Sequence, residues 1–143
     1  MPILNYTTEI NPHRTVGEIQ AKLAEMGAMA VSVDYAGREP VAVMFLLNVK
    51  GMNFSYRMPA NWRGVYKRLC DDPNVPRKLR TEQQAQRVAW RILQDWIEAQ
   101  LALIDAKMAE PAEIFLPYSV TNTGQTLFQL FEAGQLKMLG DGS

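Results

Sequence analysis

The sequence has too few metal-binding and disulfide-forming residues for most sites of those kinds. It contains a single cysteine, Cys70, and a single histidine, His13, among 143 residues. One cysteine excludes a disulfide within the chain and a cysteine-based zinc cluster, and one histidine leaves no second imidazole for a metal pair. We therefore expect no metal site and no cofactor.

Long apolar runs are also missing. No stretch of about 18 apolar residues is free of charge, and the first residues, MPILNYTTEINPHR, lack the basic and apolar regions of a signal peptide. We therefore expect a cytoplasmic protein with no membrane segment. With 143 residues, 48% of them hydrophobic, the chain is predicted to form a single domain over residues 1–143.

The familiar catalytic motifs do not occur either. The chain has no Gly-x-Ser-x-Gly elbow, no Walker loop, no His-Glu-x-x-His pair and no Gly-x-Gly-x-x-Gly turn. The sequence therefore predicts a protein that is not an enzyme. A nonstandard arrangement of arginines and carboxylates stays open as the alternative.

The formal net charge of zero conceals a separation of charge along the chain. Residues 57–91 hold nine cations and three anions, a net charge of +6, while residues 92–143 have a net charge of −5. One interpretation is that these segments neutralise each other within the fold or across an oligomer. The other is a basic surface for phosphates. Seven of the nine cations are arginines, whose forked guanidinium groups match phosphate oxygens, and this favours the second interpretation.

Apolar periodicity in the first part of the chain predicts one helix followed by three strands. The stretch from Val41 to Val49 is apolar on both faces, so we expect a central strand covered on two sides. It should form a hairpin with the next strand through Lys50-Gly51. The expected elements are an extended lead at residues 3–5, a helix from a capping box at Thr15 to Gly27, and strands at 29–35, 41–49 and 52–58.

The second part of the chain reads as mainly helical. A helix capped by Asn61 should run to Cys70, and a second capping box at Thr81 begins a helix over residues 81–108. The remainder is expected to contain an extended piece broken at Pro117, a turn at 122–124 and a short helix at 127–131. The predicted fold class is α+β. An antiparallel sheet of three or more strands packs against the long helix, in the order β-α-β-β-β-α-α with an irregular C-terminal segment.

The predicted long helix is apolar over about 220° of its circumference, counted in steps of about 100° per residue. A surface helix needs an apolar arc of only about 100°. We therefore expect the sheet to cover one side and either the C-terminal segment or a second copy of the chain to cover another. The sequence accordingly favours a homo-oligomer.

An anion site is predicted where the third strand meets the following helix. Arginines flank a helix N-terminus there, and its free backbone N–H groups attract phosphate. Aromatic rings beside the same turn are suited to stacking on bases, with packing in the core as the alternative. Tyr56 shares the face of Phe54, so we expect it to be buried, whereas the position of Trp62 is left open. An ion pair between Arg91 and Asp95 is the alternative for that arginine. The candidate phosphate ligands are Arg57, Asn61, Arg63, Lys67, Arg68, Arg87 and Arg91, and the candidate stacking residues are Tyr56 and Trp62.

Four segments, ILNYTT, RMPANWRGVYKRL, RVAWRILQDWIEAQLALI and EIFLPY, resemble an uncharacterised family of small phage and prophage proteins. The resemblance itself carries no function, but it directs attention to phage replication and recombination proteins and to inhibitors of bacterial immunity. Together with the basic segment, it leads us to expect a small non-catalytic phage-type protein whose basic face binds a phosphate-bearing ligand, nucleic acid or a nucleotide. The alternative is an anti-defence protein that sequesters a nucleotide immune signal or binds a host defence complex of the CRISPR type. In the second case the carboxylates of the acidic part would imitate phosphates: Asp95, Glu98, Asp105, Glu110 and Glu113.

Overall fold

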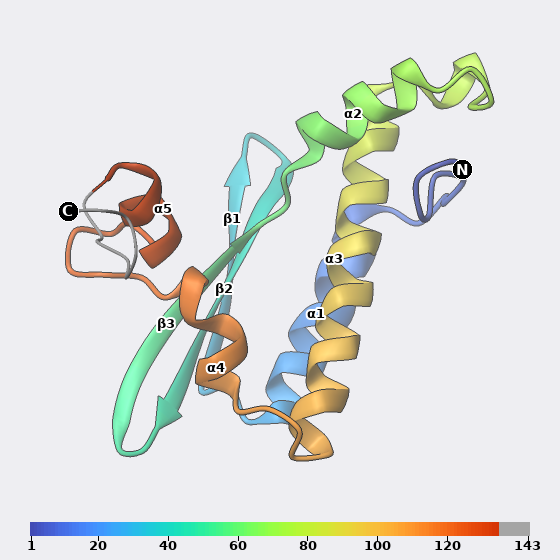
Figure 1. The fold of residues 1–143 in the computed structure, drawn as a ribbon. Helices are drawn as coiled ribbons and strands as arrows, with labels where there is room; N and C mark the ends of the chain where they lie inside the picture. The colour runs from blue at the N-terminus through green and yellow to red at the C-terminus, as the bar shows by residue number, and fades with distance from the viewer. Residues whose placement is uncertain (135–143) are drawn as a thin grey trace.

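The computed structural model describes residues 1–134 and has an α+β architecture (Figure 1). Residues 135–143, the end of the C-terminal segment expected to be irregular, lie outside the described residues. The elements in chain order are α1 (Pro12–Met26), β1 (Ala30–Ala36), β2 (Glu39–Val49), β3 (Met52–Pro59), α2 (Trp62–Asp71), η1 (Arg77–Leu79), α3 (Glu82–Asp105), α4 (Pro111–Phe115), η2 (Leu116–Tyr118) and α5 (Leu127–Glu132).

The sheet is a three-stranded antiparallel meander in the order β1-β2-β3. The strand that is apolar on both faces, β2, is central, as predicted. The β2–β3 turn has positive φ at both Lys50 (53°) and Gly51 (85°), which matches the twist of a tight hairpin. The side chain of Asn48 also accepts a hydrogen bond from the Gly51 N–H at 3.2 Å. The predicted hairpin is confirmed.

Helices α1 and α3 lie together on one face of the sheet (Figure 1). Val43, Phe45 and Leu47 of β2 point into the core on this face. The opposite face carries Met44 and Leu46, which stay partly exposed. The prediction that β2 is covered on both sides is therefore wrong for this second face. The core residues contributed by the helices are Val16, Ile19 and Leu23 of α1, Trp90 and Ile97 of α3, and Phe115 of α4.

The long apolar helix α3 is covered from several directions. Helix α1 packs along one side and α2 crosses near its N-terminal end (Figure 1). The ring of Trp96 contacts Phe115 and Tyr118 edge-on at 5.9 Å between centroids, so the C-terminal segment supplies part of the expected cover. The predicted cap is confirmed, since the Thr81 side chain accepts the Gln84 N–H at 3.1 Å. Among residues 1–134, neither α3 nor any other helix is long and apolar enough to cross a membrane.

Three local predictions differ from the structure. Residues 4–7 form a turn in place of the extended lead. Helix α1 begins at Pro12, because Asn11 accepts the N–H of His13 and the proline ring needs no hydrogen-bond partner; Thr15 is then buried inside the helix. The segment EIFLPY is helical, not extended, because Pro111 starts a short helix that a capping box stabilises.

Candidate phosphate site

The connection from β3 to α2 is short and fixed at both ends. Pro59 ends the strand, and the N–H of Ala60 donates to the Val41 carbonyl at 2.9 Å, which ties the connection to the central strand. Asn61 occupies the N-cap position of α2. The first turn of α2 therefore lies beside the end of the sheet. Arg57 projects there from the sheet face that α1 and α3 do not cover.

A hollow of about 290 Å³ lies at this connection, and we name it the β3–α2 hollow. Its lining contains four of the residues predicted for an anion site, and they come from two elements and the turn between them. A local stretch of sequence was enough to find them, because strand, turn and helix follow one another directly. The residues that line the hollow are Val41, Arg57, Pro59, Ala60, Asn61, Trp62 and Arg63.

The first turn of α2 is open to an anion. Asn61 makes no side-chain capping hydrogen bond, so the leading N–H groups of the helix have no side-chain acceptor. At Gly64 an added Cβ would meet no atom within 4 Å, so a ligand can approach the backbone closely there. The guanidinium carbon of Arg63 lies 5.0 Å from the centre of the Trp62 ring, which holds the positive charge beside an aromatic face.

Arg57 has a carboxylate partner that the sequence did not reveal. Its Nε lies 3.1 Å from Oδ2 of Asp34, and about a third of the Arg57 side chain stays exposed. The Nε of Arg57 is thus already bound to Asp34. A ligand would bind to the two terminal nitrogens of the guanidinium group or compete with Asp34 for Nε. Asp34 lies on the polar face of β1, and alternation along both strands, with the order of the sheet, would have pointed to this pair.

A second hollow of about 480 Å³ adjoins the first, and we name it the α5 hollow. It shares Arg57, Pro59 and Asn61 with the β3–α2 hollow. Phe128 is half exposed and Glu132 brings a carboxylate to the lining. The sequence missed these residues, because only tertiary packing brings α5 to this edge of β3. The remaining lining residues are Pro117, Tyr118, Thr126 and Gln129.

Several predicted phosphate ligands do not line either hollow. Lys67 pairs with Asp71, and Arg68 lies 3.1 Å from Asp72. The backbone N–H of Asn74, burial and the Arg68 guanidinium act on Asp72 together, and the net effect lowers its pKa. Lys67 and Arg68 therefore form ion pairs with the acidic residues at the C-terminal end of α2.

The two predicted ligands on α3 face away from the hollows. Arg87 donates to Oε1 of Gln84 at 3.2 Å. Arg91 lies 2.9 Å from Glu18 of α1, so the expected ion pair between Arg91 and Asp95 is wrong. Asp95 instead accepts a hydrogen bond from the amide of Asn5 at 2.8 Å. Helix α1 and the N-terminal segment, far away in the sequence, supply the partners of Arg91 and Asp95.

The two candidate stacking residues have different positions. Tyr56 is 1% exposed and packs against Phe45 and Phe115 at 5.2 and 5.8 Å between ring centroids. Burial also raises the pKa of its hydroxyl. The expected burial of Tyr56 in the core is confirmed, so its ring is not available to stack on a base. Trp62 is partly exposed and lines the β3–α2 hollow.

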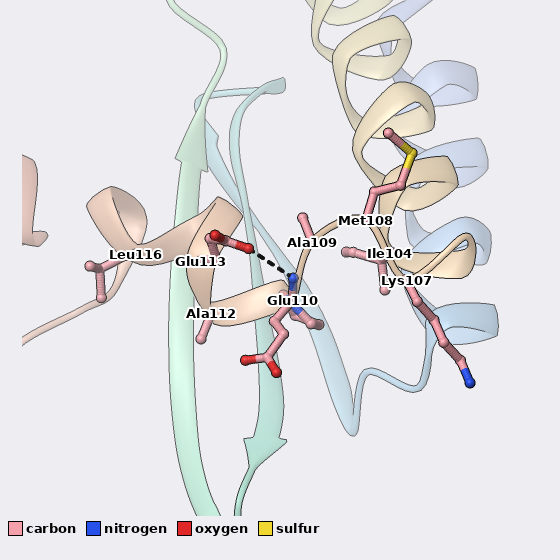
Figure 2. Close-up of a pocket in the computed structure, with 9 residues that line it drawn as sticks. Ile104, Lys107, Met108, Ala109, Glu110, Ala112, Glu113 and Leu116 are labelled. Carbon is pink, nitrogen blue, oxygen red and sulfur yellow. Dashed lines mark hydrogen bonds between the residues drawn. The ribbon is translucent and has the colours of Figure 1, made fainter.

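Four of the five acidic residues considered as phosphate mimics, Asp95, Glu98, Glu110 and Glu113, make contacts within the chain. A hollow of about 850 Å³ between the end of α3 and α4 contains Glu110 and Glu113 (Figure 2). The two residues form a capping box, in which Oε1 of Glu113 accepts the Glu110 N–H at 3.2 Å. Glu98 pairs with Lys22 at 2.9 Å. The Glu98 and Glu113 carboxylates are thus engaged by groups of the chain itself, which weakens the case for mimicry by these two.

Within residues 1–134 no group of three or more His, Cys, Asp or Glu side chains is placed to hold a metal ion. Comparison with models of known families, with well-characterised proteins and with solved structures finds no match to this chain. The geometry of the two hollows is therefore the basis for assigning a function.

Proposed function

We propose that the protein binds a phosphate-bearing ligand of nucleotide size in the β3–α2 hollow. The observation that carries the proposal is the meeting of Arg57 and Arg63 with the uncapped first turn of α2 in one hollow. Guanidinium forks and free helix N–H groups are the two donor types that recognise phosphate. Trp62 lies in the same lining, and its ring holds the Arg63 guanidinium beside the phosphate position.

A small ligand fits the charge distribution better than a long polymer does. A protein that tracks a nucleic-acid backbone needs several free cations in a row, each releasing counterions. Here Lys67, Arg68 and Arg91 are paired with carboxylates of the chain itself. Single-stranded nucleic acid is therefore the second choice, with a nucleotide first.

The α5 hollow suits the rest of such a ligand. Phe128 presents an exposed ring, and Gln129 and Glu132 present an amide and a carboxylate. A carboxylate repels phosphate but accepts hydrogen bonds from ribose hydroxyls or an exocyclic amine. The phosphate is thus assigned to the β3–α2 hollow and the nucleoside to the α5 hollow. In a phage-type protein, sequestration of a nucleotide signal is a role that this binding would serve.

Calorimetric titration with adenine nucleotides and with a short single-stranded oligonucleotide, each at two salt concentrations, tests the proposal. We expect stoichiometric nucleotide binding with weak salt dependence, and a loss of about tenfold or more in affinity for Arg63→Ala. Gly64→Glu should abolish binding by placing a carboxylate at the helix N-terminus. The matched control is Arg77→Ala, an exposed arginine of η1 outside both hollows. Absence of binding, or an equal loss in the control, would contradict the proposal.

A further inference from the structure

One edge of the sheet is open. Strand β1 pairs only with β2, and among residues 1–134 no other backbone segment hydrogen-bonds to residues 30–36. At the other edge the segment after η2 contacts β3, through a bridge between Tyr56 and Ser119 and a Val120 N–H that donates to Ser55 at 2.8 Å. An open edge leaves a row of unpaired backbone donors and acceptors that is suited to another strand.

The sequence of this edge is close to a palindrome. Residues 28–36 read AMAVSVDYA, with Ser32 at the centre. Reflection about Ser32 pairs Val31 with Val33 and Met29 with Tyr35. Ala30 and Asp34 form the one pair with unlike chemistry. A strand that reads nearly the same in both directions is complementary to an antiparallel copy of itself.

We propose that a second copy of the chain adds to β1 in antiparallel orientation about a two-fold axis at Ser32, which joins the two sheets into one of six strands. The partner for this edge is thus the protein itself, independently of any nucleotide in the hollows. Opposing residues of an antiparallel pair point to the same face of the sheet. The allowed registers are therefore those that set the core-facing residues of β1 opposite the core-facing residues of the partner strand. Among these, the register centred on Ser32 places Met29 opposite the partner's Tyr35.

Exposure along β1 and at Met29, the residue just before it, whose N–H still donates to Leu46 of β2, supports this register. Met29 is 60% exposed and Tyr35 54% exposed, and both belong to the small set of large apolar side chains left at the surface of the described residues. Val31 and Val33 between them are partly buried against the core. Pairing about Ser32 lays all four side chains of this face against their counterparts from the partner and removes apolar surface from water.

The helix beside the open edge has no charge on the side next to it. His13 of α1 stacks on Tyr35 at 6.1 Å between ring centroids, which shows which side of the helix faces the edge. In steps of about 100° per residue, Gly17, Gln20 and Ala24 share this side. The charged residues lie on the other side toward α3, where Glu18 and Lys22 are paired. The side of α1 next to the open edge therefore presents no charge to a second copy, and Asp34 on β1 itself is paired with Arg57.

Cysteine cross-linking of the full chain tests the register. In a Cys70→Ala background, Ser32→Cys should form a disulfide dimer on oxidation, because residues directly opposite on the two-fold axis have Cβ atoms about 5 Å apart. Ala30→Cys is the matched control on the same face of β1 and is equally exposed. In the proposed register the same cysteine of the second copy lies four residues further along the strand, about 13 Å away, so this variant should not cross-link.

Sedimentation equilibrium supplies the second measurement. The unmodified chain should show a monomer–dimer equilibrium, and Ser32→Lys should weaken it roughly fivefold or more by setting two like charges opposite each other. Asn53→Lys, exposed on the same sheet face but on β3, should leave it unchanged. A monomer at every concentration would overturn the proposal. Equal cross-linking of both cysteine variants, or none in a chain that dimerises, would also overturn it.

Discussion

Arg57 and Asp34 form an ion pair across the central strand of the sheet, although the strands that carry them do not pair with each other. Nε of Arg57 on β3 lies 3.1 Å from Oδ2 of Asp34 on β1. Both side chains reach over the open face of β2, beside the β3–α2 hollow. The pair therefore controls how much of the Arg57 charge is available to a ligand.

Replacing Asp34 with asparagine should strengthen ligand binding while changing stability little. Both side chains are about one-third exposed or more, and ion pairs of this kind contribute about 1 kcal/mol or less. The guanidinium no longer has a competing carboxylate, so affinity for an adenine nucleotide should rise several-fold. Titration calorimetry measures the affinity and urea denaturation the stability. Unchanged affinity in Asp34→Asn would remove Arg57 from the site.

Glu18 should make the fold sensitive to acid. The hydrogen bond from Gln94 at 2.6 Å and the contact with Arg91 lower the pKa of its carboxyl below the ordinary value. A group whose pKa is lower in the folded chain adds stability above its unfolded value, about 4.3, and loses it as the pH falls through the folded value. Urea denaturation between pH 7 and pH 3 should therefore show a smaller acid loss for Glu18→Gln than for the unmodified chain.

Glu25→Gln, an exposed glutamate of the same helix, is the control for this effect. Its acid loss should match that of the unmodified chain. If the free energy of unfolding fell equally with pH in the unmodified chain and in both variants, the contact between α1 and α3 would contribute nothing to the pH dependence.

Gln84 attaches the N-terminal segment to α3. Its Nε2 donates to the carbonyls of Tyr6 and Thr8, both at 2.9 Å, and the residue is buried. Gln84→Met keeps the volume but leaves both carbonyls without this donor, which should cost roughly 1–3 kcal/mol of unfolding free energy. Gln83→Met, exposed one residue earlier, should cost almost nothing. Urea denaturation compares the two, and equal losses would contradict a specific attachment.

The sequence predicted those parts of the fold that depend on local patterns. The apolar strand β2, the hairpin turn at Lys50-Gly51 and the cap at Thr81 follow from neighbouring residues and were found. The start of α1 was misplaced, because two capping patterns lie within a few residues and Pro12 favours the earlier one. The helical turn at α4 was missed for a similar reason, since its apolar residues resemble a strand.

The candidate site divides in the same way. Asn61, Trp62 and Arg63 are consecutive, so one turn brings them together and the sequence identified them. The partners of Arg57 and Arg91 were not found, because Asp34 and Glu18 belong to elements that only packing brings near. Charge segregation along the chain suggested a single basic face. The structure instead separates the predicted ligands: Arg57 and Arg63 line the hollows, Lys67 and Arg68 lie near the end of α2, and Arg91 lies at the contact with α1.

The backbone contacts of Ser119 and Val120 with β3 have a consequence for growth of the sheet. A sheet with two open edges can add strands at both and extend into a fibre without limit. Here the chain itself covers the middle of the β3 edge, at Ser55 and Tyr56, which leaves β1 as the fully open edge. In the proposed dimer, association through the sheet would end at a closed pair, and the same short segment that lines the α5 hollow would hinder further growth.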